Sequence, residues 1–597
     1  MTIYYVYAEN EDGTLLVGPN TRGVHAGMVD AEHTVPWKQN IVLSFEDPAH
    51  RDRVLFFSER DKMLQFMTAS GLEQRQASVY AAIDQGSAPP FQEVIAVEPD
   101  TFVDIRKQLY LLPILAAEEP AVHKIQGRRI KSALLEVAAV TKNTPPAKPP
   151  ASLSARVNPN LEDYRTAVVF VVDASGSMQR DIDSTREAAV ELLESLQRAG
   201  LSDKVRFGLI GFRDDPEAVR GVGYLTRMFV DPAKADSAQK FLAGAQQLAA
   251  SPVSTRSWAE DGLAGIQSAL NDVDWEQFGG RYIVYMSDAS LRGATADGDT
   301  PASATASTIE DINALAIEKG VAIYSYHILT RAARQRGDIE VAKAQMEAVS
   351  RYPGAGSLYY GVASARDSEV AYRSAVQQLA NDLIQHVREA TSGQAVQPVE
   401  QGSTAGKPLT IAQKNQAVGR AMQLRYLGSS AGTTAPSMFH AWAMELSPRS
   451  GSWAFSVRLL ITKDQLSDLR DTVQEIYNAA IESEFDPQAF LPSISSLALK
   501  LGRDPKIGKS GYATRLEDTE LLEFLEDLPY KSRAMELIAE DAWLDLEAAE
   551  VLSFTDSLLS KVKTYQRLHD DADNWTQLHR ADEPGDAVYP MPLTLLP

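Results

Sequence analysis

Two stretches of the chain end an apolar run with oxygen-bearing side chains. The stretch "VVFVVDASGSM" places Asp173, Ser175 and Ser177 directly after five apolar residues, and "RYIVYMSDAS" places Asp288 after a similar run. Hydroxyl and carboxylate oxygens, without sulfur or imidazole, are the ligands that a hard divalent cation prefers. These side chains therefore predict a metal site that suits Mg²⁺, with Mn²⁺ or Ca²⁺ as alternatives.

A third stretch, "SPVSTRSWAEDGL", lies between these two and directly precedes a predicted helix. It supplies further hydroxyls and carboxylates, namely Thr255, Ser257, Glu260 and Asp261. In a doubly wound sheet, ligands bind beyond the carboxyl ends of the parallel strands. We therefore expect the three stretches to meet at one edge of such a sheet.

Residues 163–395 alternate between apolar runs and amphipathic segments. Runs such as "VVFVV" and "YIVYM" are typical of strands that are covered on both faces, and the pattern as a whole predicts an α/β fold with a doubly wound, mainly parallel sheet. One amphipathic segment has apolar residues on a single helical face, at Ile182, Ala189, Leu193 and Leu196. The expected strands lie at 166–173, 204–212, 224–230, 281–288, 321–329 and 357–363. The other expected helices lie at 236–249, 259–270, 308–320, 338–351 and 367–390.

The Pro-rich stretch "TKNTPPAKPPASLSARVNPN" is the clearest domain boundary in the chain. Before it, short alternating runs between turn formers predict a small β-rich module that is SH3-like. The predicted parts around the α/β domain are the β-rich module at 1–60, a mixed or helical segment at 61–142, a linker at 143–162, a second linker at 396–414, and a mostly helical C-terminal domain with an extended tail at 415–597.

The composition of the chain excludes several classes of partner and of chemical site. The chain has 597 residues with 58 Lys and Arg against 80 Asp and Glu, a formal net charge of −22. Because phosphate binding needs a basic surface, nucleic acid and anionic lipid are not expected as partners. The chain has no cysteine, which excludes disulfides, thiolate catalysis and metal–thiolate sites and favours an oxidising compartment.

No segment of the sequence is expected to insert into a membrane. The longest apolar runs are far shorter than the roughly 20 residues that a membrane-spanning helix needs. The start, "MTIYYVYAENEDG", lacks the basic and apolar regions of a signal peptide. If Met1 is the native start, these features predict a cytoplasmic protein.

The Asp-x-Ser-Gly-Ser sequence after a buried strand, with a later loop aspartate, resembles the metal-ion-dependent adhesion site of von Willebrand factor A domains. In that family two serines bind the metal directly, the first aspartate acts largely through water, and the third loop supplies an aspartate. The resemblance assigns these roles to Ser175, Ser177, Asp173 and Asp288. The family's second loop supplies threonine or glutamate. Because "AEDGLAGIQ" resembles the glutamate type, Glu260 is the expected ligand and Thr255 the alternative.

The ligand charges indicate a mechanism. Neutral hydroxyls leave the cation poorly neutralised, with one position open to an Asp or Glu carboxylate of a partner protein. A direct Glu260 ligand would weaken that attraction unless it moves when the partner binds. We therefore expect a non-enzymatic, metal-dependent protein-binding module whose partner presents a carboxylate.

A second resemblance covers more of the chain. The stretches "FGLIGFRDD", "VPWKQNIVLSFEDPAHRDRVLFF", "LEDLPYKSRAMEL" and "VYPMPLTLLP" together resemble the non-kinase part of PpkA-type serine/threonine kinases of the bacterial type VI secretion system. This resemblance implies a periplasmic location and a role in type VI secretion assembly or its regulation. The chain has no Gly-rich loop with a strand lysine, no His-Arg-Asp loop and no Asp-Phe-Gly, so kinase activity is not expected.

Several alternatives stay open. The protein could be a cytoplasmic adaptor for a separately encoded kinase or a MoxR/chelatase-type ATPase, or a Mg²⁺-dependent hydrolase. Arg213, Asp214 and Asp215 could line the metal cleft or pair locally, and His327 is interpreted as a core histidine with one hydrogen bond. "GRDPKIGKSG" does not match the spacing of a phosphate-binding loop, because Gly508 comes one residue late.

Overall fold

The computed structural model describes residues 3–141, 161–391, 409–482 and 548–596, apart from gaps at 20–24, 38–40, 86, 108, 119, 126, 162, 236, 255–256, 295–299, 432–435, 437, 439 and 580–581. Most of both predicted linkers and all of "GRDPKIGKSG" lie outside these residues. The chain divides into two compact units, Leu153–Ser430 and a unit that combines Met1–Ser152 with Ala431–Pro597. In the described part of the chain, no helix combines the length and the apolar character needed to cross a bilayer.

A six-stranded sheet forms the centre of the Leu153–Ser430 unit. Its order is β14 (Thr226–Val230), β13 (Val205–Phe212), β12 (Thr166–Asp173), β15 (Gly280–Ser287), β16 (Ala322–Leu329) and β19 (Tyr359–Ala363). All neighbours are parallel except β13 and β14, which are antiparallel. Every residue of β12 and β15 is buried, as expected for apolar central strands. The predicted mainly parallel sheet is confirmed.

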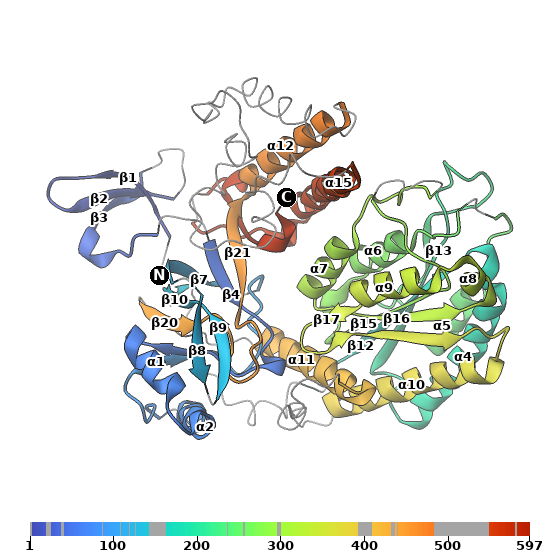
Figure 1. Ribbon diagram of the computed structural model, residues 1–597, viewed down its shortest axis with the longest axis horizontal. Helices are drawn as coiled ribbons and strands as arrows, with labels where there is room; N and C mark the ends of the chain where they lie inside the picture. Colours follow the sequence, from blue (N-terminus) through green and yellow to red (C-terminus); the bar gives the residue numbers. More distant parts are fainter. Residues whose placement is uncertain are drawn as a thin grey trace. The chain divides into compact units, whose positions relative to one another are not determined.

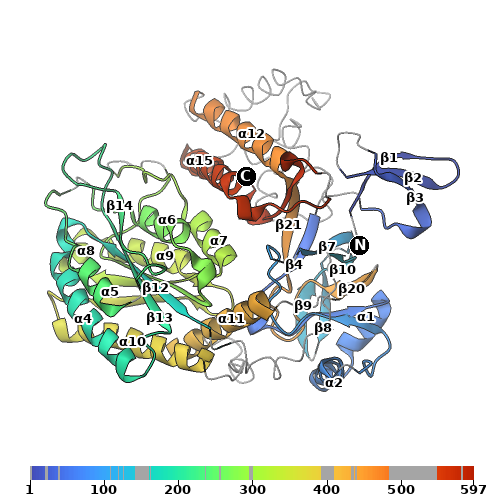
Figure 2. The same cartoon turned by 180° about the vertical axis from the view of Figure 1, so that it is seen from behind.

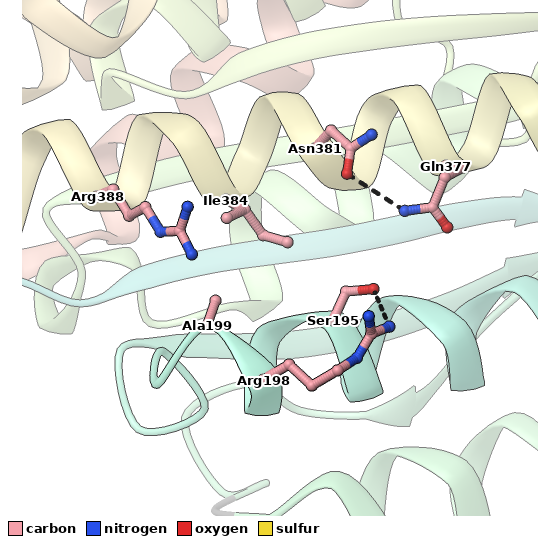
Figure 3. A pocket seen from close by; sticks show the side chains of 7 residues that line it. All are labelled: Ser195, Arg198, Ala199, Gln377, Asn381, Ile384 and Arg388. Carbon is pink, nitrogen blue, oxygen red and sulfur yellow. Dashed lines mark hydrogen bonds between the residues drawn. The ribbon is translucent and has the colours of Figure 1, made fainter.

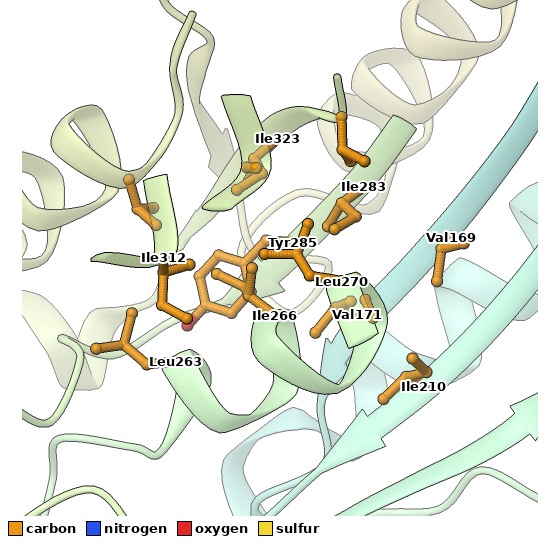
Figure 4. Packing of buried hydrophobic residues seen from close by; sticks show 14 of the residues in the cluster. Val169, Val171, Ile210, Leu263, Ile266, Leu270, Ile283, Tyr285, Ile312 and Ile323 are labelled. Atoms are coloured by element: carbon orange, nitrogen blue, oxygen red, sulfur yellow. The ribbon is translucent and has the colours of Figure 1, made fainter. Parts of the chain in front are cut away.

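Helices cover both faces of this sheet (Figure 1). One face carries α6 (Gly262–Asp272), α7 (Ile309–Lys319) and α9 (Ile339–Val349), and the other carries α4 (Gln179–Arg198), α5 (Ala238–Ala245) and α10 (Glu369–Thr391). An apolar core lies between the sheet and the helices α6, α7 and α9. In this core the ring of Tyr285 sits among side chains from α6, α7 and the strands (Figure 4). Each predicted amphipathic segment therefore has an apolar sheet face to cover.

The α/β unit extends past the predicted boundary at residue 395. Helix α11 (Ile411–Ala431) supplies Asn415, whose Oδ1 accepts a hydrogen bond from the hydroxyl of Tyr324 on β16 at 3.0 Å. The sulfur of Met422 accepts from the backbone nitrogen of Arg281 on β15 at 3.2 Å. The sequence does not predict this extension, because the contacts of α11 with the sheet are long-range and leave no local sequence signal.

The other unit contains two main sheets. Strands β1 (Tyr5–Glu9), β2 (Thr14–Gly18) and β3 (Gly27–Asp30) form a small antiparallel sheet. A nine-stranded sheet has the order β22 (Val588–Pro592), β21 (Phe455–Thr462), β4 (Ile41–Phe45), β7 (Tyr110–Ala117), β10 (Leu134–Val137), β20 (Ala441–Met444), β5 (Leu55–Phe57) and β6 (Val94–Val97), with β11 (Val140–Thr141) paired to β7.

This topology corrects the predicted SH3-like module at 1–60, and the region 415–597, predicted to be mostly helical with an extended tail, also contributes strands. All five residues of β4 are buried, so β4 needs a neighbour on each side, and it pairs with β7 and with the distant β21. The tail predicted to be extended forms β22, which pairs with β21. Both ends of the chain therefore build one sheet.

Helices complete this unit. Helices α1 (Arg60–Thr68) and α2 (Leu72–Asp84) pack near the hairpin of β8 (Ala121–Ile125) and β9 (Arg128–Ser132). Helices α12 (Lys463–Glu482) and α15 (Ala548–Asp570) lie side by side (Figure 2). The helical character predicted for the C-terminal region is thus present beside its strands.

Candidate metal centre

The first and third predicted loops meet at one edge of the six-stranded sheet. Strands β12 and β15 are parallel neighbours, so their carboxyl ends lie together. Asp173 is the last residue of β12 and Asp288 directly follows β15. The hydroxyl of Ser287 donates to Oδ2 of Asp173 at 2.7 Å, which joins the two strand ends directly.

A short run of oxygen atoms connects the side chains predicted in the first and third loops. Oδ1 of Asp173 accepts from the backbone nitrogen of Ser175 at 2.8 Å. The hydroxyl oxygens of Ser175 and Ser177 lie 3.1 Å apart, and Ser177 donates to Oδ1 of Asp288 at 3.2 Å. The structure therefore places all four of these side chains in one continuous hydrogen-bonded group.

The hydrogen bonds indicate different roles for Asp173 and for the two serine hydroxyls. Both oxygens of Asp173 are occupied, one by Ser175 N and the other by Ser287, so this side chain fixes the shape of the loop. Among the described residues, the two serine hydroxyls bond only to oxygen atoms of the same group, where a cation could replace those bonds. This arrangement suits direct ligation by the serines and an indirect part for Asp173.

Thr330 is a member of the site that the sequence analysis missed. Its hydroxyl donates to Oδ2 of Asp288 at 3.0 Å and accepts from the backbone nitrogen of Ala333 at 3.2 Å. Thr330 directly follows β16 and caps α8 (Arg331–Arg336). A threonine after an apolar strand and before a helix was the available signal, but only the order of the strands shows that β16 lies beside β15.

The second loop brings Glu260 to the same place. Its backbone nitrogen donates to the carbonyl of Ser290 at 2.9 Å, and its carbonyl accepts from the backbone nitrogen of Arg292 at 3.1 Å. The side chain is only 5% exposed, and its Oε2 has no hydrogen-bond partner in the described structure. The alternative second-loop ligand, Thr255, lies outside the described residues.

Three carboxyl groups share this buried region, and the pKa of each is raised. Burial is the main cause for all of them. The charge of Asp173 adds to burial at Asp288, whose pKa rises to about 7, and at Glu260, whose pKa lies well above its usual range. A divalent cation would favour the ionised forms, because an opposite charge nearby stabilises a carboxylate.

Arg292 is buried close to Glu260, but its hydrogen bonds go elsewhere. Its Nη1 and Nη2 donate to the two carboxylate oxygens of Asp214 at 2.5 and 2.7 Å, and its Nε donates to the carbonyl of Ala259 at 2.9 Å. This bidentate pair is neutral as a unit. Arg292 therefore makes no hydrogen bond to the carboxylate of Glu260 in the described structure, although its positive charge partly offsets the rise in the pKa of that carboxyl.

Arg213, Asp214 and Asp215, which could line the cleft or pair elsewhere, have separate partners in the structure. Asp214 is buried in its pair with Arg292. Arg213 donates to the carbonyls of Val222 and Ala249 at 2.7 and 2.6 Å, and so ties neighbouring loops together. Oδ1 of Asp215 accepts from the backbone nitrogen of Glu217 at 2.9 Å, as in a capped turn. Only Asp215 caps a turn locally, whereas Asp214 and Arg213 have partners farther along the chain.

Further side chains hold the second and third loops in place. Oδ2 of Asp338 accepts from the indole of Trp258 and from the backbone nitrogen of Ser290, each at 2.8 Å. Asp261, offered by the sequence as a candidate, bonds to Ser303 at 2.6 Å and to the backbone nitrogen of Ala304 at 2.7 Å. Asp261 thus positions a neighbouring loop.

The donor set suits a cation bound mainly by hydroxyls. Within the described ranges, no group of three or more His, Asp or Glu side chains is arranged to hold a metal by itself. Any ion here would therefore depend on Ser175 and Ser177. The unpartnered Oε2 of Glu260 indicates that a positive charge would fit, because a buried carboxylate is costly without one.

His327 lies in the core below this edge. It is fully buried, and its Nδ1 lies 3.0 Å from the hydroxyl of Tyr359. Burial lowers the pKa of His327 to about 4, so the imidazole is neutral at physiological pH. The interpretation as a core histidine with one hydrogen bond is confirmed.

Comparison with known proteins identifies one domain. The family model of the von Willebrand factor type A domain matches residues 168–290. No curated protein matches the chain. The chain therefore contains a von Willebrand factor A domain, and the match includes both strand ends and the loops between them.

Solved structures show weaker likeness. The pilus adhesin SpaC from Lactobacillus rhamnosus GG aligns with 17% identity and a TM-score of 0.29, over 48% of this chain and 36% of the adhesin. Proximal thread matrix protein 1 from the mussel byssus, with a zinc-occupied MIDAS motif, aligns with 15% identity and a TM-score of 0.25, over 37% of this chain and 48% of that protein. This chain thus spans less than half of either protein.

Proposed function

We propose that the A domain of this chain is a non-enzymatic, metal-dependent protein-binding module that holds Mg²⁺ and captures a carboxylate of a partner protein. The observation that carries the proposal is the linked set of Ser175, Ser177 and Asp288 beside the unpartnered carboxylate oxygen of Glu260. Hard oxygen ligands of this kind favour Mg²⁺.

Each side chain has a part in this proposal. Ser175, Ser177 and Asp288 would hold the cation, Asp173 would act through water, and Glu260 would add a carboxylate from the second loop. When bound, the cation supplies positive charge and an exchangeable position for a partner oxygen. Ser287 and Thr330 keep the two aspartates oriented, because each donates to one of their carboxylate oxygens.

The test is metal binding by the full chain, measured by isothermal titration calorimetry with Mg²⁺. Changing Ser175→Ala together with Ser177→Ala should weaken Mg²⁺ binding by more than about 100-fold, since both removed atoms are proposed ligands. A matched control changes Ser195→Ala with Ser268→Ala, whose hydroxyls each bond only one turn away within their own helix. Equal Mg²⁺ affinity in wild type and the first double variant would contradict the proposal.

Two biological settings follow from the sequence resemblances. Type VI secretion assembly or its regulation rests on the flanking stretches, and the family match and the structures named above give it no support. The alternative is an adaptor for a separately encoded kinase or MoxR/chelatase-type ATPase. Fractionation of cells that produce the protein distinguishes them, because the first setting predicts a periplasmic protein and the second a cytoplasmic one.

A further inference from the structure

With a divalent cation bound and its carboxyl groups ionised, the interior of the metal centre would carry more negative charge than that cation offsets. Asp173, Glu260 and Asp288 contribute three carboxylates. A fourth, Asp181, is buried nearby and accepts from the backbone nitrogen of Ala365 at 2.8 Å. The Arg292–Asp214 pair adds no net charge. A partner carboxylate would therefore approach a negative interior unless cations outside it compensate.

Arg366 supplies such a cation beside the first loop. It lies in the loop between β19 and α10, and its Nη2 donates to the carbonyl of Ser177 at 3.0 Å. The side chain is exposed, and this contact uses one of the five N–H donors of a guanidinium. Asp367, the next residue, is already paired with Arg334 at 3.2 Å. The charge of Arg366 is thus held next to a proposed metal ligand.

Arg336 supplies a second cation beside the other two loops. Its guanidinium carbon lies 4.4 Å from the ring centroid of Trp258. The indole of Trp258 bonds to Asp338, which in turn bonds to the backbone nitrogen of Ser290. Arg336 is exposed at the end of α8. Its contacts place it on the side of the centre formed by the second and third loops.

Two more exposed arginines lie close in sequence to the same loops. Arg180 is in the first turn of α4, three residues after Ser177, and Arg331 directly follows Thr330. The nearest exposed carboxylate on α4, Asp183, is bonded to Arg186 at 2.7 Å. We name the basic rim as Arg180, Arg331, Arg336 and Arg366. It stands out on a chain whose net charge is −22.

We propose that this site recognises an acidic segment of a partner protein and not a lone carboxylate. One Asp or Glu would reach the metal, and neighbouring carboxylates of the same segment would pair with Arg366 and Arg336. This inference rests on the proposed function, because it assumes the metal-bound carboxylate. The rim offsets the interior charge, which the metal alone does not.

The test compares three N-acetylated, C-amidated peptides: Gly-Gly-Glu-Gly-Gly, Gly-Glu-Glu-Glu-Gly and Gly-Lys-Glu-Lys-Gly. Their affinity for the full chain is measured by NMR titration under two conditions. About 5 mM MgCl₂ supplies the cation, and EDTA removes it. With Mg²⁺, the triglutamate peptide should bind about three- to ten-fold more tightly than the single-glutamate peptide, and the lysine peptide more weakly than both.

The variant that tests the rim combines Arg366→Gln with Arg336→Gln. It should lose the preference for three glutamates, and it should also bind the single-glutamate peptide more weakly than the wild type does, because the rim no longer offsets the interior charge. Because Arg366 touches Ser177, Arg336→Gln alone is a second variant, and it should lose part of the preference.

The matched control removes two arginines from the far end of the same domain. Arg198 and Arg388 line a groove of about 470 Å³ between α4 and α10 (Figure 3). Because α4 has 20 residues, Arg198 lies about 30 Å along the helix from the metal loop. Arg198→Gln with Arg388→Gln makes the same charge change and should leave the preference intact.

The outcomes separate the two proposals. Equal binding of the first two peptides by the wild type, or a preference that persists in the Arg366 and Arg336 double variant, would overturn the acidic-segment inference alone. Peptide binding that is the same in MgCl₂ and EDTA would overturn the proposed function, and the inference with it. A preference lost only in the rim variants would support both.

Discussion

The carboxylate of Glu260 is an unsatisfied polar group at the metal centre. It is buried beside Asp173 and Asp288, and its Oε2 has no hydrogen bond in the described structure. Burying a charge without a partner costs free energy. Glu260 therefore makes the metal-free domain less stable, and it gains most from a bound cation.

Replacing Glu260 by glutamine tests whether its carboxyl group destabilises the metal-free domain. Burial and Asp173 disfavour the ionised form of Glu260, which costs stability at neutral pH, and Glu260→Gln removes this cost, so the metal-free protein should gain about 1–2 kcal/mol in free energy of unfolding. It should also gain less from excess Mg²⁺, because a metal that binds the folded state stabilises in proportion to its affinity. Thermal unfolding in EDTA and in MgCl₂ measures both effects.

The control for this variant is Glu194→Gln, which changes an exposed side chain on α4. It should alter neither the stability in EDTA nor the stabilisation by MgCl₂. A lower melting temperature of Glu260→Gln in EDTA would show that the carboxylate stabilises the fold by itself. That result would remove the unpartnered oxygen as an argument for a metal.

Side-chain chemistry was readable from the sequence where the ligands follow one strand. Asp173, Ser175 and Ser177 lie within five residues, and their types alone indicate a hard cation. Thr330 and Ser287 were not found, because their roles depend on which strand ends lie side by side. Arg292 was also missed, since its partner Asp214 is 78 residues away.

Helix α6 is the element that carries Glu260 to the centre, and it packs against β15 without a gap. A Cβ atom added at Gly262 would lie 2.2 Å from the hydroxyl oxygen of Tyr285 and 2.6 Å from Cδ2 of Leu291. Tyr285 is buried in the core between sheet and helices (Figure 4). The glycine therefore permits a close approach of helix and strand that places the second loop.

Changing Gly262→Ala should push α6 away from β15 and displace Glu260. The expected cost is about 1–3 kcal/mol in free energy of unfolding, as for other overpacked cores, together with weaker Mg²⁺ binding. Gly176→Ala is the matched control in the same centre, because its Cβ would meet only the carbonyl of Ser251 at 3.6 Å. Urea unfolding measures the stability of both variants, and Mg²⁺ titration measures their affinity for the cation. Equal stability of the two would show that α6 can shift freely.

The pairing of the strands in the α/β unit was predictable, whereas the pairing of the strands in the other unit was not. Strands such as β12 and β15 alternate with amphipathic helices, so their pairing follows from sequence order. In the nine-stranded sheet, β4 pairs with β21, which lies more than 400 residues later. Short apolar runs do not specify a pairing partner at that distance in the sequence. The sequence therefore predicts that the strands of 1–60 form a separate module.

The A domain interrupts the chain of the other unit. Leu153–Ser430 is one continuous compact unit, whereas the nine-stranded sheet takes strands from Met1–Ser152 and Ala431–Pro597. Insertions of this kind are tolerated where the inserted domain has its own core. The core between β12, β15, α6, α7 and α9 lies wholly within the inserted residues.

The two units should therefore behave differently as fragments. A fragment of 153–430 keeps all six strands of its sheet, together with Asp173, Ser175, Ser177, Glu260 and Asp288. It should unfold cooperatively and bind Mg²⁺ with the affinity of the full chain. A fragment of 1–152 loses β21, so one edge of the fully buried β4 is left unpaired.

The fragment of 1–152 should consequently fail to fold alone and should become soluble and cooperative only when produced together with 431–597. Circular dichroism during heating, with size-exclusion chromatography of the co-produced pair, measures this. Because β7 and β10 pair within the first segment while β20, β21 and β22 come from the second, neither segment contains a complete sheet. A cooperative melt of 1–152 alone would show that its strands form an independent module after all, and would restore the N-terminal domain boundary predicted from the sequence.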